Sequence, residues 1–299
     1  MKRVLIIGGS TLLGDRLAKC FMKKCDVWYT VNRKKVVIEG ASQHIMDITN
    51  AESVNLGFAD IRPEIAVLVA AYTEVDACER NKEIAWKMNV EGARNVVNAC
   101  QRHSTKLVYI STDAIFDGTK TTPYTETDLP NPPNYYAYTK LEAEKLVLEN
   151  IENIVCRVST LYGKRSPHHR QNVIMWMIEQ FQKRKHLELF EDRFCNPTFV
   201  DEAADVIATL ALLDGRGTFH TTGRDCVSRV MLGRKIAEVF EYDESLIVPV
   251  KSREYQEVKR GLHTCLSVEK TERFIGRKIQ TLETSLRILK DQLAENPCY

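Results

Sequence analysis

The sequence has no apolar run long enough to span a membrane and no broad cluster of basic residues. Its basic start, Met1 to Arg3, leads into an apolar run that glycine ends after Ile7, which is too short for a secretory signal peptide. Lysine and arginine total 42 against 40 acidic residues, a formal net charge of +2. These absences argue against membrane proteins and nucleic-acid-binding proteins, so we expect neither membrane nor nucleic acid as a partner.

Paired cysteine motifs are also missing. The nine cysteines, an odd number, are scattered through 299 residues without a C-x-x-C pair, and most have apolar neighbours in the sequence. A reducing cytosol fits this pattern best, so we expect a cytoplasmic protein with unpaired thiols. His168 and His169 are adjacent, so their side chains should diverge, and no carboxylate pattern accompanies them. We therefore expect no metal site there.

What the sequence does contain is a regular alternation of strand-like and helical segments. With 44% apolar residues, a chain of this length can bury one large core or two modest lobes. Strand-like runs lie at 4–7, 27–31, 66–70, 107–111, 154–158 and 218–221. Helical patterns separate most of them, including Glu79–Gln101 and Lys140–Leu148. The alternation predicts an α/β fold with a doubly wound parallel sheet.

The first strand-like run leads directly into a glycine turn. Gly8 lets the backbone turn without a Cβ clash, and Leu13 and Leu17 begin a helical pattern after it. The first N–H groups of that helix would face an anion, which we expect to be a dinucleotide pyrophosphate. Thr11 occupies the position where the usual fingerprint has its middle glycine. We expect Thr11 either to hydrogen-bond the phosphate or to hold it farther away; a ligand-free turn is the alternative.

The end of the second strand-like run bears on the form of the cofactor. It reads Asn32-Arg33-Lys34-Lys35 and has no acidic residue to bind a ribose 2′-hydroxyl. Basic side chains there would instead pair with a 2′-phosphate. The sequence predicts NADPH as the preferred cofactor with NADH possible, although a solvated basic turn would look the same.

Tyr136 and Lys140 lie four residues apart at the start of a predicted helix, so both should face one pocket. A lysine ammonium beside a phenol would lower the tyrosine pKa from about 10 and let the pair transfer protons. Of the three nearby tyrosines, only Tyr136 has this offset from Lys140. Thr112 ends the strand-like run at 107–111, where its hydroxyl could bind the same substrate oxygen. An exposed helix pair is the alternative interpretation.

At these residues the chain resembles the extended short-chain dehydrogenase/reductases, and within them most closely the dTDP-4-dehydrorhamnose reductase family. The matching motifs, in order, are the glycine turn, Ala70-Ala71-Tyr72-Thr73 with Val75-Asp76, Asn89-Val90-Glu91-Gly92, Ile110-Ser111-Thr112-Asp113 with Phe116-Asp117-Gly118, Tyr136 to Lys140, and Asn196-Pro197-Thr198. The resemblance implies a Rossmann-type dinucleotide-binding domain at 1–158, its sheet completed by parts of 197–222. It implies that 159–299 form mainly a smaller C-terminal substrate-binding lobe.

The resemblance also implies roles for matched residues. Tyr136 would protonate a ketone oxygen, Lys140 would tune it and hold the nicotinamide ribose, and Thr112 would position the carbonyl. Ser111 is the second hydroxyl at this edge. The cofactor would contact Gly8, Ser10, Thr11, Leu12, Leu13, Asn32, Arg33, Asp47, Ile48, Ala70, Ala71, Tyr72, Tyr136 and Lys140. The sugar nucleotide would contact Arg157, Tyr162, Asn172 and Asn196.

The implied reaction is NADPH-dependent reduction of the 4-keto group of a nucleotide-linked 6-deoxy sugar. Alternatives are an epimerase or dehydratase of the same superfamily, although Ala114 stands where a dehydratase adds its second acid. Another is a non-catalytic NADP-binding regulatory subunit, because the beta subunit of methionine adenosyltransferase looks similar. Thr11, and the absence of the family's usual tryptophan from 158–163, fit that alternative. The oligomeric state stays open, with a homodimer possible.

Overall fold

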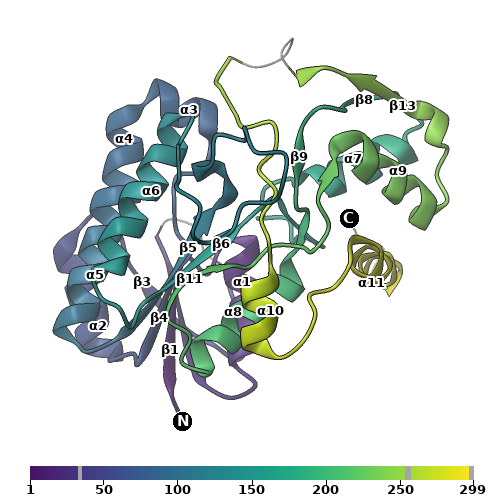
Figure 1. Ribbon diagram of the computed structural model, residues 1–299. Helices are drawn as coiled ribbons and strands as arrows, with labels where there is room; N and C mark the ends of the chain where they lie inside the picture. Colours follow the sequence, from purple (N-terminus) through teal and green to yellow (C-terminus); the bar gives the residue numbers. More distant parts are fainter. Residues whose placement is uncertain (33–35, 253–256, 296–299) are drawn as a thin grey trace.

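The computed structural model describes residues 1–32, 36–252 and 257–295. Its centre is a seven-stranded parallel sheet in the order β11-β6-β5-β4-β1-β2-β3 (Figure 1). The strands are β1 (Arg3–Ile7), β2 (Asp26–Val31), β3 (Ser42–Ile45), β4 (Ile65–Leu68), β5 (Lys106–Thr112), β6 (Ile154–Val158) and β11 (Gly217–His220). The predicted doubly wound parallel sheet is confirmed. The sequence reasoning missed only β3 in this sheet, because this edge strand is mostly polar and exposed.

Helices cover both faces of the sheet because alternate residues of its strands point to opposite sides. Val4 and Ile6 of β1 pack toward α1 (Leu12–Phe21) and α8 (Val200–Leu212). Leu5 and Ile7 pack toward the opposite side (Figure 1). That side carries α2 (Ala51–Ile61), α5 (Gly92–Arg102) and α6 (Tyr135–Leu148). The carboxyl ends of β1, β4 and β5 thus meet at one edge, where such sheets bind ligands.

The single helix expected at Glu79–Gln101 is wrong. The segment forms α3 (Val75–Arg80), α4 (Lys82–Trp86), a π-helical turn η1 (Lys87–Glu91) and α5. Asn89 in η1 accepts a hydrogen bond from the Tyr72 N–H at 2.7 Å and donates to the Tyr72 carbonyl at 3.0 Å and to Thr139 at 3.0 Å. π-Helical turns within helices often occur at functional sites. Here the turn fixes the loop after β4 against α6.

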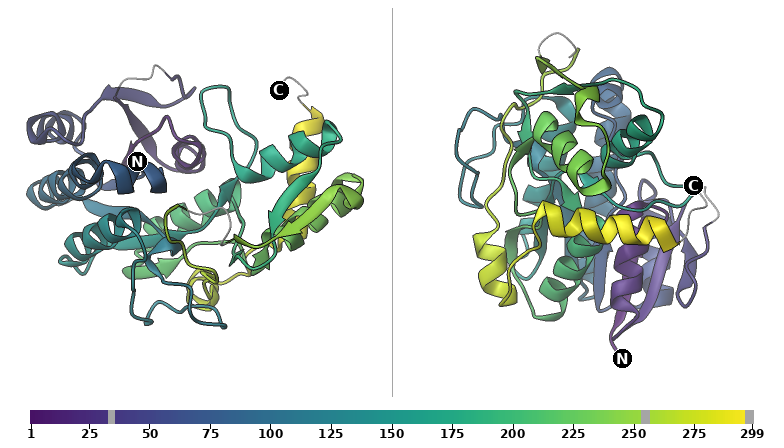
Figure 2. Two further views of the ribbon diagram at one scale, coloured as in Figure 1. Left: turned by 90° about the horizontal axis from the view of Figure 1, so that it is seen from above. Right: turned by 90° about the vertical axis from the view of Figure 1, so that its right-hand side faces the viewer.

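Most of the chain after residue 160 forms a smaller lobe, apart from β11, which belongs to the central sheet, and α8, which packs on it. It contains three two-stranded sheets, β7 (Leu161–Tyr162) with β10 (Thr198–Phe199), β8 (Leu187–Phe190) with β13 (Ile247–Val250), and β9 (Phe194–Cys195) with β12 (Val227–Ser228). Its helices are α7 (Val173–Gln182), α9 (Arg229–Phe240) and α11 (Leu282–Glu295), and Figure 2 shows α11 lying across this lobe. Helix α10 (Glu269–Ile275) returns to the sheet beside α8 and β11. The division at residue 158 stays a prediction.

Two cysteines of the smaller lobe, Cys226 and Cys265, form a disulfide. The expectation of unpaired thiols is wrong for these two, because residues 39 apart in sequence meet with their Cα atoms 5.6 Å apart. The other six cysteines in the described ranges are free. Separately, none of the helices described is both long and apolar enough to cross a membrane.

Candidate active site

A cleft of about 700 Å³ opens at the carboxyl edge of the sheet, between the glycine turn, the ends of β4 and β5, and the first turns of α6. The loop at 168–172 also lines the cleft. Nine of the residues predicted from the sequence line it: Ser10, Thr11, Leu12, Leu13, Ala71, Thr112, Tyr136, Lys140 and Asn172. The structure therefore brings the expected phosphate-binding turn and the expected catalytic residues to one site.

The glycine turn has the close packing that a dinucleotide cradle requires. Gly8 has φ of +103°, and a Cβ there would lie 2.8 Å from the Ala70 nitrogen. A Cβ on Gly14 would lie 2.3 Å from the Gly8 oxygen. The Thr11 hydroxyl donates to the Gly8 carbonyl at 2.9 Å and accepts from the Gly14 N–H at 3.0 Å, which caps α1. The Thr11 side chain thus stabilises the turn itself, and its two expected roles toward phosphate stay predictions.

Asn134 positions Tyr136 and Lys140 by capping α6, accepting the Ala137 N–H at 3.0 Å. Both side chains are buried, with 9% and 3% of their surface exposed. The Lys140 ammonium donates to the Ile110 carbonyl at 2.7 Å and lies 4.0 Å from the centre of the Tyr109 ring. The cleft wall thus holds a phenol and an ammonium group beside the end of β5.

Burial dominates the protonation of both groups. It raises the pKa of Tyr136 above its usual value, opposed by a hydrogen bond with Thr112. It lowers the pKa of Lys140 to about 7, opposed by the charge of Glu144. The expectation that Lys140 lowers the pKa of Tyr136 is therefore wrong for the protein alone. Tyr136 is a neutral phenol, the form that can donate a proton.

Asp113, which the sequence reasoning did not assign to the site, anchors Thr112. Its half-buried carboxylate accepts hydrogen bonds from the hydroxyls of Thr112 at 3.2 Å, Ser159 at 2.8 Å and Thr264 at 2.7 Å. Burial raises the pKa of Asp113, while these hydrogen bonds oppose the rise. Its place directly after Thr112 at the end of β5 was the available signal. The contact with Thr264 could not be foreseen, because that residue lies 151 positions away.

Beside the cleft is a cavity of about 90 Å³ whose lining includes three arginines and the acidic residue Asp113. It shares Val75, Ala114 and Thr160 with the cleft lining and carries Arg193, Arg229 and Arg260. Burial and the charges of the other two arginines lower the pKa of Arg193 to about 10. Within the described residues, the buried Nη1 of Arg229 has no hydrogen-bond partner. This concentration of positive charge suits an anion. No sequence pattern indicates this cavity, because the three arginines come from separate segments.

Three of the four residues expected to bind a sugar nucleotide do not line the cleft. Arg157 is buried in an ion pair with Glu144, with nitrogen to oxygen distances of 2.8 and 3.1 Å. Tyr162 is fully buried in the smaller lobe against Phe199. Asn196 accepts the Leu266 N–H at 2.7 Å. Arg157 and Tyr162 thus have internal contacts, while the buried amide nitrogen of Asn196 has no hydrogen-bond partner among the described residues. The substrate role of all three stays a prediction.

Asn172, the fourth, lines the cleft, and its side chain caps the N-terminus of α7. It accepts the Met175 N–H at 3.0 Å and donates to the Gly163 carbonyl at 3.1 Å. Its neighbours His168 and His169 also line the cleft. They do not diverge as expected, because their rings meet edge to face with centroids 4.1 Å apart. Burial and the adjacent His168 lower the pKa of His169 to about 4, so its imidazole is neutral.

The remaining residues predicted to contact a cofactor lie near the cleft or beyond it. Ile48 is buried against Gly92, and the Asp47 carboxylate accepts the Thr49 N–H at 2.9 Å. Asn32 is exposed just after β2, and Arg33 lies outside the described residues. Ala70 lies against Gly8, and Tyr72 is tied to η1. Their contacts with a cofactor stay predictions.

The parallel sheet, the glycine turn and the cleft with Thr112, Tyr136 and Lys140 define a Rossmann-type oxidoreductase of the short-chain dehydrogenase/reductase class. Residues 1–294 match a family model described as the RmlD substrate binding domain. The chain belongs to this family, which confirms the resemblance drawn from the sequence.

Known relatives agree with this assignment. The dTDP-4-dehydrorhamnose reductase of Aggregatibacter actinomycetemcomitans is 27% identical over 303 residues, covering 97% of this chain and 99% of the relative. Methionine adenosyltransferase 2 subunit beta of Mus musculus is 33% identical over 261 residues, covering 83% of this chain and 75% of the relative. A dTDP-4-dehydrorhamnose reductase from Bacillus anthracis str. Ames, solved in complex with NADP, superposes with a TM-score of 0.84 at 28% identity, covering 98% of this chain and 100% of that one.

Proposed function

We propose that this protein reduces the 4-keto group of a nucleotide-linked 6-deoxy sugar with NADPH. The observation that carries the proposal is one cleft that combines a dinucleotide-type glycine turn with the buried side chains of Thr112, Tyr136 and Lys140. Relatives named as reductases of such sugars, matched over nearly the whole chain, support the substrate class.

Side chains of the protein supply the proton and position the substrate for the reaction. When bound, reduced nicotinamide supplies the hydride. Tyr136, kept as a neutral phenol by burial, donates its proton to the developing alkoxide. Thr112, whose one hydroxyl proton points to Asp113 without substrate, can turn that proton to the carbonyl oxygen and orient it for the transfer. Lys140, with a pKa of about 7, can shed or take up a proton at neutral pH and so restores the phenol.

The arginine cavity supports a substrate that carries an anionic group. Arg193, Arg229 and Arg260 converge beside the cleft, and only Arg260 forms a close ion pair among the described residues, at 2.8 Å from Asp76. A nucleoside diphosphate linked to the sugar would place its phosphates at this cavity while the keto carbon reaches Tyr136. Each charged hydrogen bond to phosphate would contribute about 1.5–3 kcal/mol.

NADPH is the proposed form of the cofactor. The basic sequence after β2 supports it, as does the relative crystallised with NADP. Asn32 is exposed directly after β2, where its side chain would be accessible to a 2′-phosphate. NADH remains a usable substitute because the pyrophosphate-binding turn is common to both forms.

A non-catalytic NADP-binding regulatory subunit is the second candidate. The likeness to methionine adenosyltransferase 2 subunit beta favours it. The intact Thr112, Tyr136 and Lys140 group favours catalysis instead. An epimerase or dehydratase is disfavoured because Ala114, where the second acid would stand, lines the cleft. Cytoplasmic location and a homodimer stay predictions, testable by cell fractionation and sedimentation.

The deciding experiment incubates the full chain with NADPH and each of three sugar nucleotides: a dTDP-4-keto-6-deoxy sugar, dTDP-glucose and UDP-galactose. A reductase consumes one NADPH per hydroxy sugar formed, and only with the keto sugar. A dehydratase or epimerase, supplied with NAD⁺ or NADP⁺ in place of NADPH as the hydride acceptor, would convert dTDP-glucose or UDP-galactose with no net change in that cofactor. A regulatory subunit would bind NADPH and convert none of the three, which would overturn the proposal.

A further inference from the structure

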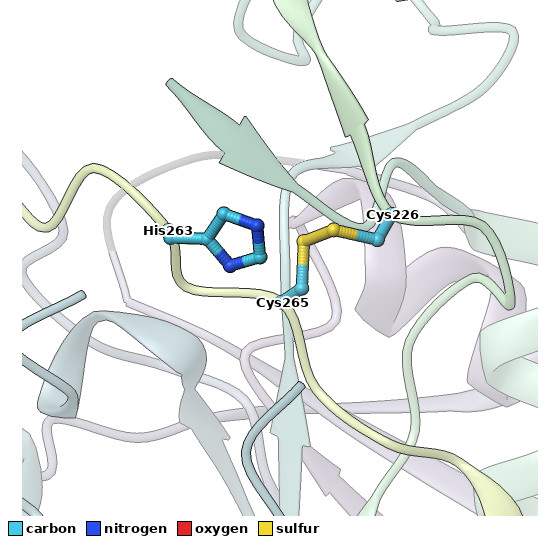
Figure 3. A group of neighbouring side chains, drawn as sticks. All are labelled: Cys226, His263 and Cys265. Atoms are coloured by element: carbon cyan, nitrogen blue, oxygen red, sulfur yellow. A yellow bond between two sulfur atoms is a disulfide. The ribbon is translucent and has the colours of Figure 1, made fainter. Parts of the chain in front are cut away.

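The smaller lobe holds a second group of reactive side chains, outside the lining of the cleft. Cys226, His263 and Cys265 lie together, with their potential ligand atoms all within 4.8 Å of one another. Figure 3 shows the imidazole of His263 beside the bond between the two sulfurs. The sequence analysis had no pattern to recognise, because Cys226 lies 37 positions before His263 and no C-x-x-C pair is present.

Strand β9 holds the three residues in place from both edges. Cys226 directly precedes β12, which pairs with β9 in antiparallel fashion. On the other edge, His263 bridges Phe194 in parallel, and the Phe194 N–H and carbonyl bond Leu262 and Thr264 at 2.6 and 3.1 Å. His263 and Cys265 are two residues apart on this extended segment, so their side chains share a face. The arrangement is therefore fixed by backbone pairing rather than by the disulfide alone.

The donor set is that of a zinc site. Two thiolates and one imidazole are preferred zinc ligands and leave one tetrahedral position for water. The group is shielded, with Cys265 buried and the other two half-buried. His263 also has a buried ring nitrogen, Nδ1, with no hydrogen-bond partner in the described part of the chain. A buried ring nitrogen without a hydrogen-bond partner destabilises the fold unless it binds a ligand.

We propose that Cys226, His263 and Cys265 bind Zn²⁺ when the disulfide is reduced. Reduction by a dithiol breaks the sulfur–sulfur bond: two electrons and two protons pass to the cysteines, and the reductant becomes a disulfide. Zinc then displaces the two thiol protons and forms two bonds to sulfur. Disulfide and metal exclude each other, because each uses both sulfurs.

Either linkage ties the segment 261–266 to β12. That segment supplies Thr264, whose hydroxyl holds Asp113, and Leu266, whose N–H binds Asn196. Zinc therefore replaces the disulfide as the cross-link beside the active site in a reducing compartment, where a disulfide is short-lived.

The test is a Co²⁺ titration of the full chain, reduced with a phosphine and freed of reductant under inert gas. The expected result is one equivalent of bound Co²⁺ with a thiolate-to-metal absorption band, lost on adding Zn²⁺. The oxidised chain should show no such band. Cys226→Ser and Cys265→Ser should abolish it, and His263→Gln should weaken Co²⁺ affinity at least roughly tenfold.

Cys20→Ser is the matched control, because Cys20 is a half-buried free cysteine on α1 and should not affect the band. Circular dichroism checks that each variant is folded. If a cysteine variant does not fold, the reduced and oxidised natural chains still decide the question. Absence of a thiolate band from the reduced chain overturns the proposal, as does a band that survives in both cysteine variants.

Discussion

The ammonium group of Lys140 shows how burial controls a single side chain in this protein. It is buried between the Ile110 carbonyl and the Tyr109 ring, and its pKa falls to about 7. Its charged form is thus disfavoured in the folded state relative to the unfolded state, where the pKa is about 10.5. The four-residue offset predicted its position beside Tyr136. It could not predict the direction of these pKa shifts, which depend on how deeply the tertiary fold buries both groups.

The first prediction concerns Lys140 and pH. Between about pH 7 and 10.5 the unfolded chain binds more protons at Lys140 than the folded chain, so its contribution to stability rises with pH and is lost as pH falls to 7. The free energy of unfolding of Lys140→Met, measured in urea, should lack this pH dependence. The difference in the free energy of unfolding between the natural chain and the variant should therefore change by on the order of 2 kcal/mol between pH 7 and pH 9. Lys145→Met, on the exposed side of α6, is the control, and an equal change in that variant would contradict the account.

Asp113 gives a second prediction at this scale. Its carboxylate accepts three hydroxyls, so Asp113→Ala leaves Thr112 unanchored, while Asp113→Asn keeps an acceptor for part of the set. In the sugar reduction assay we expect kcat to fall roughly tenfold or more in the alanine variant and less in the asparagine variant, with NADPH affinity unchanged in both. An equal loss of kcat in both variants would show that the negative charge of Asp113, rather than its anchoring of Thr112, supports catalysis.

At the scale of single elements, α6 and β6 are joined by the buried pair of Glu144 and Arg157, with 2% and 5% of their side-chain surfaces exposed. An arginine at the end of a strand is an ambiguous signal in sequence, because a ligand and a buried carboxylate both suit it. The helix residue that pairs with it lies 13 positions earlier, and only the packing of α6 on the sheet brings the two together. The ion pair gives Arg157 a structural role, and its substrate role stays a prediction.

The prediction for this pair separates structure from binding. Arg157→Met leaves Glu144 as an uncompensated buried charge, so the free energy of unfolding should fall by about 3–5 kcal/mol. The double variant with Glu144→Leu should recover much of that loss, and the KM for the sugar nucleotide should stay close to its natural value in the double variant. Arg216→Met, in an exposed pair with Glu152, should cost less than about 1 kcal/mol. A rise in the KM for the sugar nucleotide in the double variant, with stability recovered, would show that Arg157 contacts the substrate.

Helix α1 supplies the other prediction at the level of elements. Because the Thr11 hydroxyl caps this helix, Thr11→Ala should lower the free energy of unfolding by about 1 kcal/mol. Thr11→Ser keeps the hydroxyl and should be close to neutral. Urea unfolding measures both variants, beside NADPH titration. If NADPH binding weakens by much more than the cap explains, Thr11 contacts phosphate after all.

For the whole molecule, the sequence was sufficient where local pattern and global fold agree. Buried apolar runs such as Val4–Ile7 and Ile154–Val158 predicted their strands, and the glycine turn and the offset of Tyr136 from Lys140 predicted the cleft. The arginine cavity, the contact of Thr264 with Asp113 and the Cys226–Cys265 bond could not be predicted. The first two join segments that meet only after the smaller lobe packs against the sheet, and the disulfide joins residues 39 apart within the smaller lobe.

The central claim is that this cleft reduces a keto sugar with Tyr136 as the proton donor. The most direct test follows NADPH oxidation with a dTDP-4-keto-6-deoxy sugar in the natural chain and in Tyr136→Phe, with NADPH affinity titrated for both. The account predicts turnover in the natural chain, a loss of at least roughly a hundredfold in kcat in the variant, and unchanged NADPH affinity. Turnover that persists in Tyr136→Phe, or NADPH binding with no turnover in the natural chain, would contradict it.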